Sequence, residues 1–424
     1  MKLKPTKGQL DFLDWEYGMF FHFGPATFSV GYQDVDEVEL KDFNPTELDC
    51  DDWISTAKAA GAKYAILTTK HHNGFALWPS KYTEYGVKNT PWKDGKGDVV
   101  AEFVSSCRKY GLKVGLYYSP AQWGKGAASF KDAKEYDDYF INQISELLSN
   151  YGKIDYLWFD GYGSEGREYD KKRIVEEIFR LQPDILTFCD PAWTPCVRWI
   201  GNEDGYASLD NPLVVDKWNF SVLTEEAVSL GNSMFLPAEC DCKLRSTWFW
   251  YDYNEDTIKD IEELFGMYEQ SVGHGSNFLI NIGPDNRGLI ADADKARILE
   301  LGERIKKNYS NPLKFSGVIQ DGNTFTIANK DCDIFFATKN TTFEIVNTVV
   351  IEEDLTEGQS IKSFNLYAHL PYDRLSRILV YIGKTVGHKL ICRFPAIRSP
   401  KITMEVTESD GTVVVKDMKA YFVK

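Results

Sequence analysis

Two acidic residues stand out for the chemistry that their positions allow. Asp160 closes the apolar segment LWFDG, and Glu203 lies in the segment RWIGNEDG. In a parallel β/α fold, residues at the carboxyl ends of strands gather at one face of the sheet. Two carboxyl groups placed there suit glycoside hydrolysis, in which one attacks or stabilises the anomeric carbon and the other protonates the leaving oxygen.

Histidine and tyrosine residues follow other predicted strands. His22 follows the first strand, His71 and His72 follow the second, and Tyr117 ends the third. Such side chains suit recognition of hydroxyl groups, because each offers a donor or an acceptor on a fairly rigid frame. Any one of them alone is more often structural. Together they indicate a single polar site.

The elements that would position these residues are short apolar segments, typical of parallel strands buried on both faces. The predicted strands are Tyr17–Phe23, Ala62–Thr69, Leu112–Ser119, Asp155–Asp160, Asp184–Asp190, Met234–Glu239 and Asn277–Gly283. An open sheet binds its ligand at one switch point, whereas polar residues at every strand end converge only if the sheet closes. We therefore predict a TIM-like (β/α) barrel.

Amphipathic helices are predicted between these strands. Asp98 can cap a helix whose apolar residues Val99, Phe103, Val104 and Cys107 recur at helical spacing. A second helix carries Phe140, Ile141, Ile144, Leu147 and Leu148, and a third spans roughly Asn254–Ser271.

The pattern changes after about Asn311, where short β-branched segments alternate with turns. These segments are Thr324–Ala328, Asp333–Thr338, Phe343–Glu352, Ile378–Ile382 and Val413–Lys416. Such a pattern is typical of a β-sandwich. We predict a barrel domain over residues 1–310 and a C-terminal β-sandwich over residues 311–424.

Composition bounds the partners and the compartment. The net charge of −15 argues against nucleic acid, whose phosphates would be repelled. No apolar segment long enough for a signal peptide or a membrane helix is present, so we expect no membrane association. The eight cysteines show no disulfide framework. We expect a cytoplasmic protein, or a secreted or periplasmic one if a signal segment had been removed.

Several motifs, in order along the whole chain, resemble one known family. They are YGMFFHFG, KHHNGFALWPSKYTEY, GKGDVV, GLYYS, LWFDG, the GNE of RWIGNEDG, and SNFLINIGPDNRG. The chain thereby resembles the retaining α-L-fucosidases of glycoside hydrolase family 29. The resemblance implies exo-acting hydrolysis of terminal α-L-fucosyl residues from fucosylated oligosaccharides or glycoconjugates.

The same resemblance implies a role for each matching residue. Asp160 matches the nucleophile, and Glu203 looks like the general acid/base, with Glu239 as its competitor. The positions that match residues binding the sugar or lining its pocket are His22, His71, His72, Tyr117, Arg198 and Trp248. The family implies no cofactor.

Two segments depart from the family pattern. Members commonly carry a Glu-Trp pair after the first strand, but here the loop reads SVGYQDVDEVEL, in which Tyr32, Gln33 or Glu37 could substitute. The loop after the third strand reads SPAQWG and fits neither common subgroup. Both departures leave linkage preference open, together with a related L-sugar such as L-galactose as substrate.

Three other interpretations compete with this one. Gly161–Gly166 is a formal G-x-G-x-x-G followed by Asp184, which would suit an NAD-dependent oxidoreductase. However, Asp160 and Glu165 would repel a pyrophosphate. Adjacent His71 and His72 suggest a metal, but neighbours at a strand end point in opposite directions, so we predict none. A catalytically inactive glycan-binding protein is the third possibility.

Overall fold

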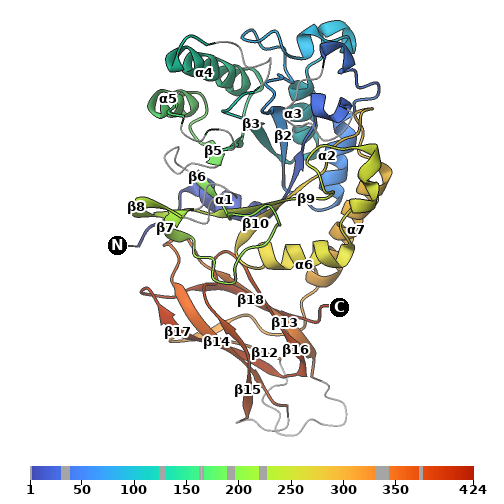
Figure 1. Ribbon diagram of the computed structural model, residues 1–424. Coiled ribbons are helices and arrows are strands. Elements are labelled where there is room, and N and C mark those ends of the chain that lie inside the picture. Colours follow the sequence, from blue (N-terminus) through green and yellow to red (C-terminus); the bar gives the residue numbers. More distant parts are fainter. Residues whose placement is uncertain are drawn as a thin grey trace.

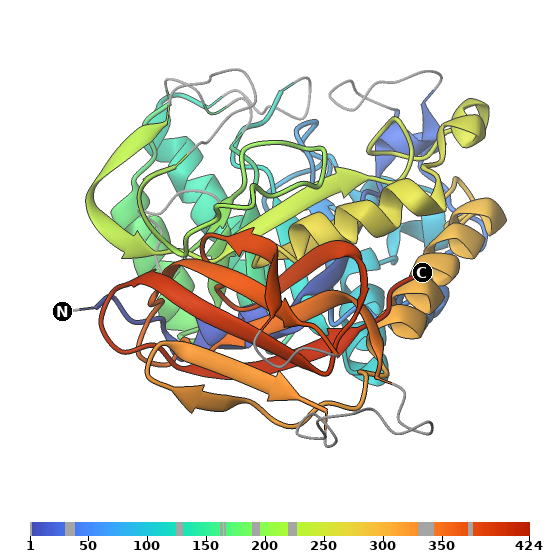
Figure 2. The same ribbon diagram turned by 90° about the horizontal axis from the view of Figure 1, so that it is seen from below.

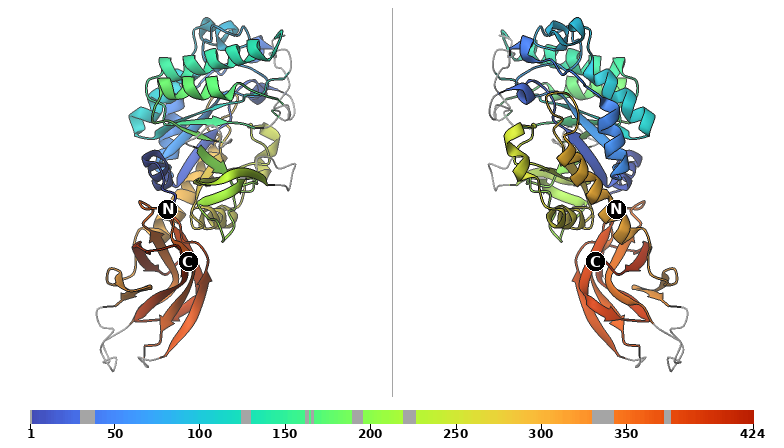
Figure 3. Two further views of the ribbon diagram at one scale, coloured as in Figure 1. Left: turned by 90° about the vertical axis from the view of Figure 1, so that its left-hand side faces the viewer. Right: turned by 90° about the vertical axis from the view of Figure 1, so that its right-hand side faces the viewer.

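The computed structural model describes residues 2–29, 39–123, 130–161, 164, 167–188, 196–218, 227–329, 343–371 and 376–424. It contains a closed parallel barrel and, in the C-terminal region, two antiparallel sheets. Figure 1 shows the barrel above and the antiparallel sheets below, and the side views in Figure 3 show the same stacking. The predicted fold class, a TIM-like barrel followed by a β-sandwich, is confirmed.

Eight strands close the barrel, in the order β1-β10-β9-β6-β5-β4-β3-β2. Every neighbouring pair is parallel. The strands are β1 Tyr17–Phe21, β2 Tyr64–Lys70, β3 Lys113–Tyr118, β4 Tyr156–Phe159, β5 Leu186–Phe188, β6 Cys196–Trp199, β9 Ala238–Lys243 and β10 Ser276–Asn281.

Two parts of the predicted strand order are wrong. β6 was not predicted, because it has only four residues, one of them Arg198, and shows no apolar run. The predicted strand Met234–Glu239 joins the end of β8 (Val228–Phe235) to the start of β9. β8 pairs with β7 (Val214–Trp218) in a separate two-stranded sheet.

Most helices pack around the barrel wall, and the first one closes the end of the barrel at which the strands begin. They are α1 Lys7–Trp15, α2 Cys50–Ala59, α3 Val99–Tyr110, α4 Ala133–Asn150, α5 Lys171–Leu181, α6 Ile261–Ser271 and α7 Asp292–Tyr309. The predicted cap of α3 is confirmed, since the Asp98 carboxylate accepts a hydrogen bond from the Ala101 N–H at 2.9 Å. The predicted third helix starts later than expected, at Ile261, after a 3₁₀ segment at Asp252–Thr257.

Aromatic side chains fill the inside of the barrel. The interior cluster joins residues of seven strands with Phe12 and Trp15 of α1, which close the end of the barrel at which the strands begin. A Cβ atom at Gly18 would lie 2.4 Å from the Tyr64 ring, so β1 needs glycine where this ring crosses it. The alternation of inward and outward side chains along each strand fixes which residues reach the site.

The C-terminal region forms two sheets, of order β11-β12-β17-β14-β15 and β16-β13-β18. Figure 2 shows these strands from below, lying across the barrel. They are β11 Ile319–Asp321, β12 Thr324–Ala328, β13 Ile345–Glu353, β14 Ile361–His369, β15 Arg377–Gly383, β16 Leu390–Arg398, β17 Lys401–Ser409 and β18 Val415–Tyr421. The predicted strand at Thr324–Ala328 coincides with β12, while Asp333–Thr338 lies outside the described residues.

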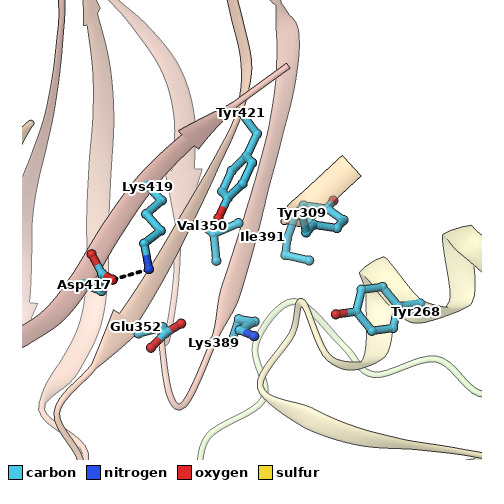
Figure 4. A pocket seen from close by; sticks show the side chains of 9 residues that line it. All are labelled: Tyr268, Tyr309, Val350, Glu352, Lys389, Ile391, Asp417, Lys419 and Tyr421. Atoms are coloured by element: carbon cyan, nitrogen blue, oxygen red, sulfur yellow. Dashed lines mark ion pairs between the residues drawn. The ribbon is translucent and has the colours of Figure 1, made fainter. Parts of the chain in front are cut away.

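The barrel and the sandwich share an apolar seam. Val350, Ile391 and Tyr421 of the sandwich belong to the same buried cluster as residues of α6 and the barrel wall. Beside them lies a small cavity of about 70 Å³, into which Tyr268 and Tyr309 face from the barrel side (Figure 4). Among the described residues, no helix combines the length and the apolar character that crossing a membrane requires.

Candidate active site

Asp160 lies directly after β4, two residues beyond the inward-facing Trp158, and its side chain is 23% exposed. The Tyr117 hydroxyl donates to Asp160 Oδ2 at 2.7 Å. His72 Nε2 lies 3.3 Å from the same oxygen. This carboxylate is partly exposed and is held by a phenol and an imidazole at the end of a barrel strand. Such a setting suits a catalytic role better than the capping of a turn.

His72 is itself oriented by a serine. The Ser119 hydroxyl donates to the Ala121 carbonyl at 2.7 Å, so it accepts from His72 Nδ1 at 2.6 Å. This leaves Nε2 facing Asp160. When Nε2 also carries a proton, the imidazole is a cation that pairs with the carboxylate.

His22 is a buried neutral histidine with a defined tautomer. Asn281 Nδ2 donates to the Trp248 carbonyl at 2.7 Å, so its Oδ1 faces His22 Nδ1, 2.7 Å away. His22 Nδ1 therefore carries the proton, and Nε2 offers a lone pair. Burial lowers the pKa of His22 to about 3, despite the Asn281 hydrogen bond and the Asp160 charge, which raise it.

Aromatic rings join the polar residues into one wall. The His71 ring is stacked on Tyr117, with centroids 5.6 Å apart, and lies 5.6 Å from the His22 ring. The Trp248 ring stacks on the His22 ring, with centroids 4.8 Å apart. Trp248, for which a pocket-lining role is predicted, thus lies beside His22, and that role stays a prediction.

Glu203 is linked to this wall of side chains by a lysine that contacts both. Its carboxylate, 39% exposed, accepts a hydrogen bond from Lys243 Nζ at 3.1 Å. The same ammonium lies 5.0 Å from the centre of the Trp248 ring. Glu203 follows β6, not the fifth strand as predicted, and a bridge between Asp204 and Cys242 holds its loop against β9.

Arg198 is turned away from this wall of side chains, contrary to the prediction that it lines the pocket. Its neighbours Val197 and Trp199 belong to the interior cluster, so strand alternation turns Arg198 outward. The guanidinium is buried against Asn211 and donates to the Pro212 carbonyl. Burial lowers the pKa of Arg198 to about 10.

Glu239, the predicted competitor of Glu203, lies inside β9 rather than after it. It is 0% exposed and accepts hydrogen bonds from Tyr64, Tyr156 and Trp158 in the barrel interior. Burial raises the pKa of Glu239 to about 7, and these donors only partly offset the rise. A carboxyl group in this position has no route to a glycosidic oxygen, so it does not fit the role of acid.

Sequence reasoning missed several residues that orient the site. Lys243, Asn281 and Ser119 each fix one of the residues that it did identify. Strand alternation could have found Lys243, because it shares the inward face of β9 with Glu239 and Asp241. Trp199, which donates to Asp241 Oδ1 at 2.7 Å, follows from the same rule once β6 is recognised.

The predicted opposite orientation of His71 and His72 is wrong. The rings of His71 and His72 lie 4.3 Å apart, and one possible ligand atom from each comes within 4.8 Å of Asp160 and of the other. Both histidines follow the last residue of β2, where the chain turns and strand alternation no longer applies. These three residues could hold a cation by spacing, and the absence of a metal stays a prediction.

Two other segments of interest are only partly described. Most of Gly161–Gly166 and the loop containing Tyr32, Gln33 and Glu37 lie outside the described residues. After β3, the Trp123 N–H donates to the His72 carbonyl at 2.8 Å, and its ring lies 4.6 Å from that of His72. The SPAQWG loop thus borders the site.

Comparison with known proteins decides the family. The model of the family "Alpha-L-fucosidase" matches residues 22–310, a stretch that includes every site residue named above. This chain belongs to the alpha-L-fucosidase family. It is a glycoside hydrolase of family 29, as its sequence motifs indicated.

Relatives of this fucosidase are known from sequence and from structure. It is 32% identical to alpha-L-fucosidase 1 of Arabidopsis thaliana over 95% of this chain and 85% of the plant protein. A glycoside hydrolase family 29 member from a rumen bacterium superposes with a TM-score of 0.86 at 28% identity, covering 100% of this chain and 78% of that one.

A family 29 fucosidase from Ruminococcus gnavus, solved in complex with fucose, gives a TM-score of 0.84 at 26% identity, covering 100% of this chain and 95% of that one. These similarities extend over both the barrel and the sandwich. A small-molecule or glycan substrate follows from them.

Proposed function

We propose that this protein is an exo-acting retaining alpha-L-fucosidase in which Asp160 is the nucleophile and Glu203 the general acid/base. The observation that carries the assignment is the setting of Asp160. Its carboxylate lies at the end of a barrel strand, held at 2.7 Å by Tyr117 and at 3.3 Å by His72. Glu203 joins the same wall of side chains through Lys243 and Trp248.

In the first step, ionised Asp160 attacks the anomeric carbon while protonated Glu203 gives its proton to the leaving oxygen. The bond from the anomeric carbon to the aglycone breaks as the bond to Asp160 forms. In the second step, Glu203 takes a proton from water, which attacks the same carbon and releases L-fucose and free Asp160. Retention requires the two carboxyl groups to lie about 5–5.5 Å apart.

His22, His71 and Trp248 form the wall against which the sugar would lie. The Nε2 lone pair of His22 can accept a hydrogen bond from a sugar hydroxyl, since Nδ1 is committed to Asn281. We propose terminal α-L-fucosyl residues of oligosaccharides or glycoconjugates as substrate, with a related L-sugar such as L-galactose as the alternative. Comparing kcat/KM on the para-nitrophenyl glycosides of the two sugars separates these cases.

Azide rescue tests the two catalytic assignments. Asp160→Ala should lose about 10³-fold or more in kcat on para-nitrophenyl α-L-fucoside, because the covalent intermediate cannot form. Azide should then enter the vacated space and give β-L-fucosyl azide.

Glu203→Ala should lose about 10²–10⁴-fold in kcat on substrates with poor leaving groups. There azide should attack the intermediate and give the α-azide.

Product stereochemistry supplies the independent check. The wild-type enzyme should release α-L-fucose first, seen by NMR before mutarotation. Release of β-L-fucose first would mean inversion and would refute the double displacement. An Asp160→Asn variant that keeps full glycan binding while the wild type shows no turnover would support an inactive glycan-binding protein instead.

The remaining proposals concern cofactors and compartment. We expect full activity after exhaustive chelation; loss that a divalent cation restores would assign a metal to His71, His72 and Asp160. We expect no change in NAD(H) fluorescence on adding protein. A change in fluorescence would favour the NAD-dependent oxidoreductase instead. A reducing compartment such as the cytoplasm is supported by five described cysteines that are buried and form no disulfide: Cys50, Cys107, Cys240, Cys242 and Cys392.

A further inference from the structure

A buried carboxyl group that the proposed mechanism does not use lies in the barrel interior beneath the active site. Glu239 is 0% exposed. Its Oε2 accepts from the Tyr64 hydroxyl at 2.6 Å. Its Oε1 accepts from the Tyr156 hydroxyl at 3.2 Å and from the Trp158 indole N–H at 3.0 Å.

This cluster is costly to build and is not explained by stability. Burying a carboxyl group carries a large desolvation penalty, which hydrogen bonds only partly offset. Replacing buried charged groups by apolar side chains of similar volume is often neutral or stabilising. The three side chains that donate to Glu239 all belong to the apolar cluster of the barrel interior. A glutamate here therefore calls for a function.

The cluster leads to the nucleophile through two rings. Trp158 lies on β4 two residues before Asp160, and its indole N–H donates to Glu239. The Trp158 ring stacks on Tyr117, with centroids 5.3 Å apart and planes 22° apart. The Tyr117 hydroxyl donates to Asp160 Oδ2 at 2.7 Å. Each link in this chain is a direct contact between closely packed side chains.

We infer that Glu239 is a positioning residue for the nucleophile, holding Asp160 in its attacking geometry through Trp158 and Tyr117. The inference rests on the proposed function, because it assigns meaning to the position of Asp160. A misplacement of about 1 Å at a reacting group can cost about 10²-fold in rate. An acceptor that fixes the indole plane thus has a catalytic effect without touching the substrate.

Three variants test this role. Glu239→Leu removes the acceptor and should lower kcat at least about tenfold while KM stays within about threefold. Glu239→Gln should restore kcat to within about threefold of wild type. Its Oε1 can accept from Trp158 and Tyr156, and its amide can donate to the Tyr64 hydroxyl. Trp158→Phe keeps the stacked ring, loses the N–H, and should reproduce the kcat loss.

The matched control is another buried carboxyl group, far from the site. Glu353 in the sandwich is 2% exposed and accepts from the Ile361 N–H at 3.0 Å. Glu353→Leu should change the unfolding temperature but leave kcat and KM at wild-type values. If Glu239→Leu does not fold, Trp158→Phe carries the test alone.

The decisive readout is the rate of labelling by a 2-deoxy-2-fluoro fucosyl fluoride, followed by intact mass and peptide mapping. We expect labelling of Asp160 in every folded variant, slowed at least about tenfold in Glu239→Leu and Trp158→Phe. Labelling of Asp160 at the wild-type rate in folded variants would overturn the inference and leave the proposed function standing. Label on a different residue of the wild type would refute the proposed nucleophile itself.

Discussion

At the scale of single residues, the site depends on which atom of each histidine carries a proton. Burial lowers the pKa of His22 to about 3, so the ring is neutral throughout the range in which the enzyme would work. A neutral ring has one donor and one acceptor, and Asn281 Oδ1 takes the donor. Asn281 thus leaves Nε2 of His22 as the acceptor.

Asn281→Leu should therefore lower kcat/KM by about tenfold or more, equivalent to about 1.4 kcal/mol, the size of one hydrogen bond. Steady-state kinetics on para-nitrophenyl α-L-fucoside measures this. Asn347→Leu is the control, because it breaks two amide hydrogen bonds with Val423 in the sandwich and should leave kcat/KM unchanged. Equal kcat/KM for Asn281→Leu and wild type would show that the tautomer of His22 does not matter.

At the scale of elements, the long apolar strands and the strand-end residues could be predicted from the sequence, whereas two neighbouring strands could not. β6 and β9 carry Arg198, Glu239, Asp241 and Lys243, so neither shows the apolar run by which buried parallel strands are recognised. The polar residues of β9 face inward and are paired there with residues of other elements, and these partners could not be predicted from the sequence. Arg198 was misplaced because β6, and hence its alternation, was not predicted.

The end of the barrel that α1 closes gives a prediction at this scale. Phe12 of α1 is 0% exposed, and its ring lies 5.4 Å from Tyr156 and 6.0 Å from Tyr64. Phe12→Ala should lower the free energy of unfolding by about 3–5 kcal/mol, because it opens a cavity beneath these rings. Denaturant unfolding measures the loss. Phe422→Ala removes the same side chain where it is 41% exposed and should cost less than about 0.5 kcal/mol.

At the scale of the whole molecule, the barrel and the sandwich are joined by charge as well as by apolar contact. We propose that the two domains divide between residues 310 and 311, because α7 ends at Tyr309 and the Leu313 N–H already bonds to Ala420 of β18. Glu16, which follows α1, receives a hydrogen bond from Lys389 and lies 3.3 Å from His388 Nε2. Both partners belong to the sandwich.

This ion pair predicts how stability depends on pH. Burial alone would raise the pKa of Glu16, but the His388 hydrogen bond and the Lys389 charge outweigh it and hold the pKa at about 2. A carboxyl group with a lowered folded-state pKa stabilises the protein above its unfolded pKa of about 4.3 and loses that contribution as pH falls towards 2. The side chain is only 24% exposed, and the full contribution is on the order of 3 kcal/mol.

Glu16→Gln should therefore be less stable than wild type at pH 7, and the difference should shrink steadily as pH falls from about 4.5. Urea unfolding at a series of pH values gives both curves. Glu357→Gln, at an exposed pair with Lys4, should show almost no difference at any pH. A Glu16→Gln deficit that stayed constant down to pH 3 would mean that the seam is held by packing alone. The lysine and the histidine would then add nothing to the docking of the sandwich on the barrel.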